Sequence, residues 1–280
     1  MPKVKNLLAE LPPAETIDLE ELRKALADGS VELVCVLGPT ASGKTRYAVA
    51  LARELGGEII SADSRQVYRG MDIGTGKDLS EYGEVPYHLI DIADPGDGYN
   101  VFRFKEDFGK AFADIRSRGA VPILCGGTGL YINAVTSGYD FRSRKPLSAP
   151  AVQTTSIPLH PQGTGGVPPE IPCGIPRTYF IGTLVTREVR NARIDARLDA
   201  RLQEGMIDEI KSLLDKGVPS SVLISYGLEY KFVTLYLLGE LDYASMQQKL
   251  AIAIHQFAKR QMTWFRGMER SGVRIHWVEV

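Results

Sequence analysis

The sequence predicts an α/β fold in which a parallel β-sheet is flanked by helices and followed by a C-terminal helical segment. Short apolar runs alternate with amphipathic helical patterns over residues 31–140, an order typical of parallel sheets. A glycine-rich loop follows the first apolar run, and two long helical patterns occupy most of residues 187–272. With 280 residues and 44% hydrophobic side chains, the chain can bury a large core, as one large or two smaller domains.

Each element of this fold has its own local pattern. Apolar runs predict strands at residues 31–37, 58–64, 87–92, 120–127, 177–186 and 273–280. Apolar residues at helical spacing predict helices at residues 45–57, 105–119, 187–217 and 241–272. We expect the third of these helices to break or bend near Gly205 and the last to end near Gly272.

By composition, the chain divides into four segments. Residues 1–30 are an N-terminal extension, 31–140 the α/β core around the glycine-rich loop, and 179–280 the strand and helices that complete the core. Between them, residues 141–178 contain half of the chain's sixteen prolines and almost no periodicity. We therefore expect a proline-rich linker there.

Composition also argues against several classes of protein. No apolar run approaches the roughly 20 residues that a membrane span needs, so we expect a cytoplasmic protein that does not enter membranes. The net charge of −1 argues against a strongly basic nucleic-acid binder, although a local basic face is compatible with it. The three cysteines and four histidines are widely spaced, which indicates neither a disulfide framework nor a histidine metal site. We expect a monomer.

The clearest motif is "GPTASGKT" at residues 38–45. Its G-x-x-x-x-G-K-T spacing, between an apolar run and a helical pattern, predicts a phosphate-binding loop and a P-loop NTPase-like sheet. Lys44 would reach the outer phosphate oxygens, and the Thr45 hydroxyl would hold Mg²⁺. The expected phosphate contacts are Gly38, Pro39, Thr40, Ala41, Ser42, Gly43, Lys44 and Thr45. Because no run of four apolar residues ends in Asp-Glu, the sequence favours group transfer over nucleotide-driven movement.

Two polar residues follow predicted strands and should lie near this loop, because the carboxyl ends of parallel strands share one edge. Asp63 ends the run "EIISAD", where it could accept a proton from a nucleophile or cap a turn; the spacing leaves both open. Thr128, in "CGGTGLY", could offer its hydroxyl to a phosphate or a substrate, although glycine turns after strands are common for structural reasons alone.

Basic residues recur in two predicted helices. Four arginines at helical spacing share one face: Arg190, Arg193, Arg197 and Arg201. They could form a solvated face paired with Asp195, Asp199 and Glu204, or one or two could face phosphates. The segment "AKRQMTWFR" at residues 258–266 mixes basic and aromatic side chains in a way that suits phosphates and bases, although its aromatic residues equally suit a core.

Several stretches together resemble one family, the tRNA dimethylallyltransferases, also called tRNA isopentenyltransferases. The matching stretches are "GPTASGKT", "EIISADSRQVYRGMDIGTGK", "YHLIDIADP", "PILCGGTGLY", "RIDARLDARLQEGMIDEI" and "AKRQMTWFR". They follow one another in order and cover most of residues 31–140 and 179–270. The resemblance is therefore specific.

The resemblance implies that the loop holds the diphosphate of dimethylallyl diphosphate, with Mg²⁺, and that the prenyl group moves to the exocyclic amine of the adenine beside the tRNA anticodon. Asp63 would receive the amine proton, Thr128 and Lys44 would lie at the reacting groups, and Arg193 would face diphosphate or tRNA. The adenine would have to be flipped out of its stack to react. The implied tRNA contacts are Asp63, Ser64, Arg65, Gln66, Lys259 and Arg260.

The sequence departs from the family at residues 141–178, where members usually carry a longer helical insertion and then an arginine-rich helix. The chain therefore resembles a short variant, which leaves a smaller acceptor such as AMP open. A kinase that uses ATP on a small molecule is a second alternative. A nucleic-acid-binding protein or nucleotide switch without catalysis is a third.

Overall fold

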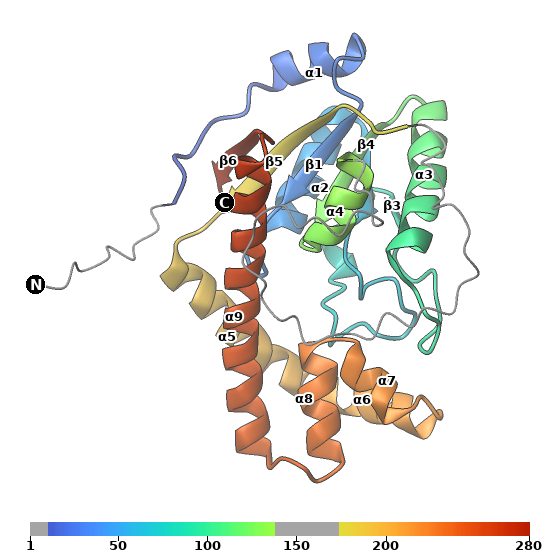
Figure 1. Cartoon of the computed structure of the whole chain (residues 1–280), viewed down its shortest axis with the longest axis vertical. Helices are drawn as coiled ribbons and strands as arrows, with labels where there is room; N and C mark the ends of the chain where they lie inside the picture. The colour runs from blue at the N-terminus through green and yellow to red at the C-terminus, as the bar shows by residue number, and fades with distance from the viewer. Residues whose placement is uncertain (1–10, 138–173) are drawn as a thin grey trace, which may run out of the picture.

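The structure is a computed structural model that describes residues 11–137 and 174–280 (Figure 1). Almost all of the predicted linker at 141–178 lies outside the described residues. The described chain contains one sheet of six strands in the order β3-β2-β4-β1-β5-β6, and every neighbouring pair is parallel. This confirms the predicted α/β fold. The strands are β1 (Leu33–Leu37), β2 (Gly57–Ser61), β3 (Tyr87–His88), β4 (Val121–Gly126), β5 (Thr178–Leu184) and β6 (Ile275–Glu279).

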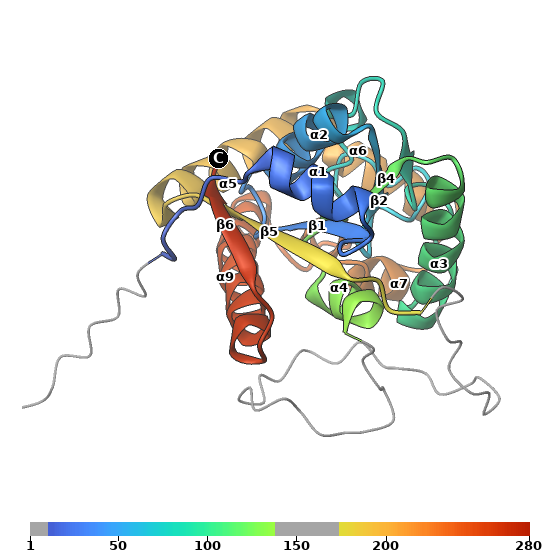
Figure 2. The ribbon, with the colours of Figure 1, turned by 90° about the horizontal axis from the view of Figure 1, so that it is seen from above.

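β1, in the middle of the sheet, is buried along its whole length because helices cover both faces. On one face, the apolar side chains of α1 and α2 pack on the sheet, and Leu22 of α1 is only 2% exposed. On the other face, α3, α4 and the end of α9 form a second cluster (Figure 2). The helices of these two layers are α1 (Leu19–Ala27), α2 (Lys44–Leu55), α3 (Val101–Ser117) and α4 (Gly129–Thr136).

The third predicted strand was too long. β3 covers Tyr87–His88 alone, whereas the prediction ran over residues 87–92. Leu89 and Asp91 have φ angles of 62° and 56°, which an extended strand does not contain. The N–H of Asp91 donates instead to the carbonyl of Gln66 at 3.1 Å, so the chain turns away from the sheet toward the loop after β2.

The predicted start of the helix at 105–119 was also wrong. α3 begins at Val101, one turn earlier, because the Asn100 side chain accepts hydrogen bonds from the N–H groups of Phe102 and Arg103. An asparagine in this position caps the free N–H groups of a helix start. The spacing of apolar residues, on which the prediction was based, gives no information about such a cap.

A lobe of helices stands beside the sheet and has its own apolar core. Gly205, with a φ of 100°, separates the first two helices, which confirms the predicted break. α9 runs from the lobe back to the sheet (Figure 1) and ends just before Gly272, as predicted. The lobe consists of α5 (Arg187–Gln203), α6 (Met206–Asp215), α7 (Ser220–Ser225), α8 (Leu228–Leu237) and α9 (Tyr243–Arg270); α7 and α8 had not been predicted. No helix among the described residues is long and apolar enough to cross a membrane.

Glu209 of α6 fastens this lobe to a loop of the α/β core. Its carboxylate accepts hydrogen bonds from the N–H groups of Asp72, Ile73 and Gly74 at 2.8, 2.7 and 3.0 Å. The Tyr230 hydroxyl donates to the same carboxylate at 2.7 Å. Successive N–H groups around one anion form a stable nest. The loop 71–77, which lines the pocket described below, therefore depends on the lobe for its position.

We predict that Glu209→Ala lowers the free energy of unfolding by about 2 kcal/mol, since it leaves several partly buried donors without their acceptor. Urea unfolding would measure the change. Asp208→Ala is the matched control, because Asp208 lies in the same first turn of α6 but is exposed. Equal stability of the two variants would show that the nest does not hold the lobe to the loop.

Candidate active site

The loop between β1 and α2 has the backbone of a phosphate-binding loop. Ala41 and Gly43 have φ angles of 62° and 80°, and the N–H of Ser42 donates to the carbonyl of Pro39 at 3.2 Å. A Cβ on Gly38 would lie 2.2 Å from Oγ1 of Thr183 on β5, so only glycine fits there. The N-terminus of α2 has neither a side-chain cap nor an acidic residue in its first turn. A helix start of this kind attracts an anion.

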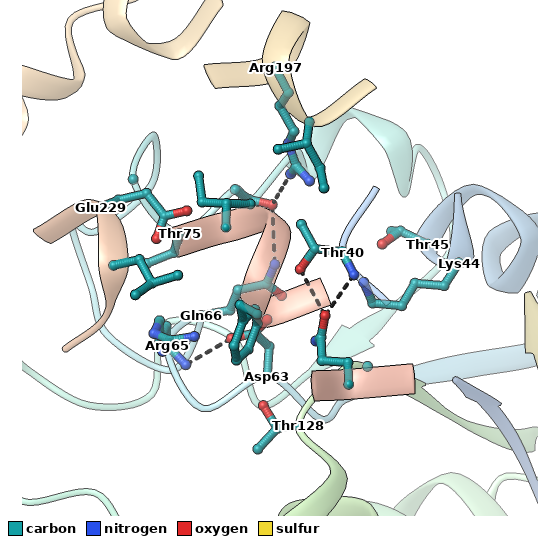
Figure 3. A pocket seen from close by; sticks show the side chains of 18 of the residues that line it. Thr40, Lys44, Thr45, Asp63, Arg65, Gln66, Thr75, Thr128, Arg197 and Glu229 are labelled. Atoms are coloured by element: carbon teal, nitrogen blue, oxygen red, sulfur yellow. Dashed lines mark hydrogen bonds between the residues drawn. The ribbon is translucent and has the colours of Figure 1, made fainter. Parts of the chain in front are cut away.

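Lys44 is the first residue of α2 and lines a pocket at the carboxyl edge of the sheet, together with Thr45 (Figure 3). Burial lowers the pKa of the Lys44 ammonium, whereas the nearby Cys125 and Asp63 act in the opposite direction. The ammonium is therefore poorly solvated, and an anion beside it would stabilise its charge. Burial also raises the pKa of Cys125 to about 12, so this thiol stays neutral and is not a nucleophile.

Asp63 and Thr128 lie in the same pocket as Lys44. Asp63 follows β2, and its Oδ1 accepts a hydrogen bond from the N–H of Arg65 at 2.9 Å. The carboxylate thus caps a turn and lines the pocket at once. Thr128 precedes α4, and its Oγ1 accepts a hydrogen bond from the N–H of Ser64 at 3.3 Å. This contact places the Thr128 hydroxyl beside the turn that carries Asp63.

Arg65 and Gln66 also line the pocket, and their side chains hold its walls. The Arg65 guanidinium lies 5.5 Å from the centre of the Phe257 ring, and its Nε donates to the carbonyl of Tyr226 at 2.5 Å. Gln66 donates to the carbonyl of Gly76 at 3.2 Å. These contacts join the turn after β2 to the helical lobe and to the loop 71–77.

The remaining predicted site residues lie outside the pocket lining. The Arg193 guanidinium is near the phosphate-binding loop, since a Cβ on Gly43 would lie 3.9 Å from its Nη1. Lys259 and Arg260 are exposed on α9. Ser64 contributes only its backbone to the contacts described here. The structure therefore brings together Thr40, Lys44, Thr45, Asp63, Arg65, Gln66 and Thr128 as lining residues.

Of the two alternatives for the arginine face, the solvated face does not hold for Arg197 and Arg201. Arg197 donates to Asp78 at 2.8 Å and to the carbonyl of Gly76 at 3.3 Å. Arg201 is only 8% exposed and donates to the carbonyl of Ile73 at 2.7 Å. Both line the pocket, and neither pairs with the acids of its own helix that the sequence suggested. Their partners come from a loop more than a hundred residues earlier, which helical spacing cannot report.

Sequence reasoning also missed the apolar wall of the pocket and several polar side chains in it. The wall comes from the lobe: Ile194, Leu198, Leu228, Ile254 and Phe257. Helical spacing indicated core packing for all of these except Leu228, whose helix had not been predicted. The missed polar residues are Thr75, Tyr82, Glu229 and Gln261. The pocket has a volume of about 1080 Å³, which includes space open to the solvent.

The sequence matches known family models and curated proteins. The family model named IPP transferase matches residues 66–165 and 167–268, and the model named isopentenyl transferase matches residues 31–84. The chain belongs to the IPP transferase family. Among curated relatives, tRNA dimethylallyltransferase 1 of Azobacteroides pseudotrichonymphae is 49% identical, over 89% of this chain and 93% of the relative. The protein of the same name from Porphyromonas gingivalis is also 49% identical, over 88% and 93%.

Solved structures of family members have the same fold. The full-length tRNA isopentenylpyrophosphate transferase of Bacillus halodurans superimposes with a TM-score of 0.71 at 34% identity, over 89% of each chain. The tRNA isopentenylpyrophosphate transferase of Staphylococcus epidermidis gives a TM-score of 0.71 at 29% identity, over 88% of this chain and 92% of the other. The IPP transferase identified here thus shares both its sequence and its architecture with the family.

We predict that this IPP transferase binds inorganic diphosphate and that Lys44→Met weakens the binding about ten- to a hundredfold, the usual worth of a charged hydrogen bond. As the pH rises, the wild-type ammonium should lose its proton below the ordinary lysine pKa, because burial lowers that pKa. The wild type and the Lys44→Met variant should therefore become more alike in their affinity for diphosphate as the pH rises. Calorimetric titration between pH 7 and pH 10 would test both effects.

Lys249→Met is the control for this titration, because Lys249 is exposed on α9. It should bind diphosphate as the wild type does. Equal binding by the Lys44 variant at every pH would show that the lysine does not contact the phosphates.

Proposed function

We propose that this chain transfers the dimethylallyl group of dimethylallyl diphosphate to the exocyclic amine of the adenine beside the anticodon of tRNA. Family membership and the two curated relatives described above, both named tRNA dimethylallyltransferase 1, support prenyl transfer to tRNA. The observation that carries the proposal is one pocket that combines three surfaces. These are a phosphate-binding loop with Lys44, a carboxylate at Asp63, and an apolar wall on the lobe.

The chemistry follows from this combination. The bond between the allylic carbon and the diphosphate oxygen breaks, and the diphosphate leaves with the electron pair. A bond forms between that carbon and the adenine nitrogen, and the Asp63 carboxylate receives the proton that the amine gives up. Negative charge grows on the leaving oxygens, where Lys44 and the start of α2 stabilise it. The apolar wall suits the five-carbon chain and keeps water from the allylic carbon.

A magnesium ion fits the chemistry of the loop. When bound, Mg²⁺ neutralises charge on the diphosphate and makes it a better leaving group. Thr45 lines the pocket and offers a hydroxyl ligand. The described residues contain no group of three histidine, cysteine, aspartate or glutamate side chains that could hold a metal. In our proposal Thr45 and the diphosphate oxygens would hold the ion.

Transfer of a labelled prenyl group would test this function. The protein is incubated with labelled dimethylallyl diphosphate and an anticodon stem-loop RNA, with AMP or ATP in parallel reactions. Label on the adenine of the RNA is the expected result. Label on AMP alone would indicate an adenylate prenyltransferase, and transfer of the ATP γ-phosphate would indicate a kinase. Tight RNA binding without transfer would indicate a non-catalytic binding protein.

We predict that Asp63→Ala lowers kcat at least a hundredfold while the protein stays folded, because the amine loses its proton acceptor. Binding of inorganic diphosphate should change little, since that ligand is held by the loop and Lys44. Single-turnover transfer and thermal unfolding would measure the two properties. Asp208→Ala, an exposed change in α6, is the control. Full activity of the Asp63 variant would remove the residue from the reaction.

A further inference from the structure

Gln261 lies in the middle of the basic and aromatic segment of α9, but it is buried, with 7% of its surface exposed. Its Oε1 accepts hydrogen bonds from the N–H of Thr40 at 2.8 Å and from the Thr40 hydroxyl at 3.2 Å. Its Nε2 donates to the carbonyl of Gly127 at 3.0 Å. Both ends of the amide are therefore bound to backbone groups on two different loops.

One of these loops is the proposed diphosphate site, and the other carries Thr128, which contacts the turn of Asp63. Thr40 belongs to the phosphate-binding loop after β1, and Gly127 directly precedes Thr128 in the turn after β4. β1 and β4 are neighbours in the sheet, with Leu37 in register with Gly126, so the two loops leave the sheet side by side. Gln261 spans them from the side of α9. It thus sets the spacing between the phosphate-binding loop and the Thr128 turn.

The turn after β4 is shaped to meet this helix. A Cβ on Gly127 would lie 2.4 Å from Nε2 of Gln261, and a Cβ on Gly129 would lie 2.3 Å from the Trp264 ring. The two glycines on either side of Thr128 therefore let the backbone pack directly on α9. A third glycine, Gly126, has no room for a Cβ, because that atom would lie 2.4 Å from the carbonyl oxygen of Ala62. Thr128 is consequently held from both sides.

We propose that Gln261 is a positioning residue, which fixes the phosphate-binding loop relative to the Thr128 turn and so aligns the departing diphosphate with the incoming amine. This inference rests on the proposed function. The amide satisfies both neighbours, because its oxygen accepts from the N–H of Thr40 and its nitrogen donates to the carbonyl of Gly127. Transfer reactions are sensitive to such alignment. Gln261 thus differs from the exposed Lys259 and Arg260 beside it, which are available to RNA.

Two variants separate positioning from folding. Gln261→Met keeps the volume of the side chain and loses every hydrogen bond, and we expect kcat to fall about ten- to a hundredfold, as for a small misalignment. The Kd for the stem-loop RNA should change less than about twofold, because the Gln261 side chain is only 7% exposed and its amide is bound to Thr40 and Gly127. Gln256→Met is the matched control on the exposed face of α9 and should behave as the wild type.

The Gln261→Glu variant adds a second measurement, the pH dependence of its activity, which a purely structural role would not change. Its carboxylate can still accept from Thr40 but repels the carbonyl of Gly127; once protonated, its hydroxyl can donate to that carbonyl. The activity of this variant relative to the wild type should therefore rise as the pH falls. Both proteins have the same charged groups around the pocket: Lys44, Asp63, Arg65, Arg197, Arg201 and Glu229. The ratio of the two activities therefore reports the effect of the new carboxyl group.

The outcomes distinguish the two proposals. No transfer by the wild type would overturn the proposed function, whereas an active wild type with an unchanged kcat in Gln261→Met would overturn the role of Gln261 alone. A drop in kcat for Gln261→Met that is matched by partial unfolding, with no pH-dependent recovery in Gln261→Glu, would also overturn it. Recovery of Gln261→Glu at low pH would support positioning even if the methionine variant folds poorly.

Discussion

The candidate site depends on positive charge gathered at the carboxyl edge of the sheet. The first turn of α2 carries no capping side chain and no acid, and the buried Lys44 ammonium has a lowered pKa. Burial of a charge is unfavourable unless a partner of opposite charge lies beside it. In the proposed function that partner is the diphosphate, and catalysis requires that the site bind it more tightly as it becomes the leaving group.

The helical lobe completes the site from the other side of the chain. Its helices supply the apolar wall, and Glu209, Arg197 and Arg201 hold the loop 71–77 through backbone groups. These contacts are made to N–H and C=O groups of the loop, so they depend on the path of its backbone and on its glycines. A Cβ on Gly74 would meet the Tyr230 ring at 2.8 Å, and one on Gly76 would meet the Arg197 guanidinium at 2.3 Å.

The sequence was sufficient for the parallel sheet, the phosphate-binding loop and the break at Gly205, because each of these has a local signal. It was not sufficient for the two-residue β3, whose end depends on backbone torsions at Leu89 and Asp91. The role of Gln261 was also out of reach, since its partners lie 221 and 134 residues away. In the sequence it is one polar residue in a basic segment. Local patterns locate elements and motifs, but contacts between distant loops appear only in the folded chain.

Asp63 shows how one side chain can serve structure and chemistry together. The sequence left open whether its carboxylate caps a turn or accepts a proton, and the geometry makes these roles compatible. One oxygen accepts from the N–H of Arg65, which fixes the rotation of the carboxylate. Arg65 is held in turn by Phe257 and by the carbonyl of Tyr226 on the lobe. A carboxylate held by one oxygen presents the other in a defined direction, which lowers the entropic cost of meeting an amine. The turn cap is thus a condition for the proposed proton transfer.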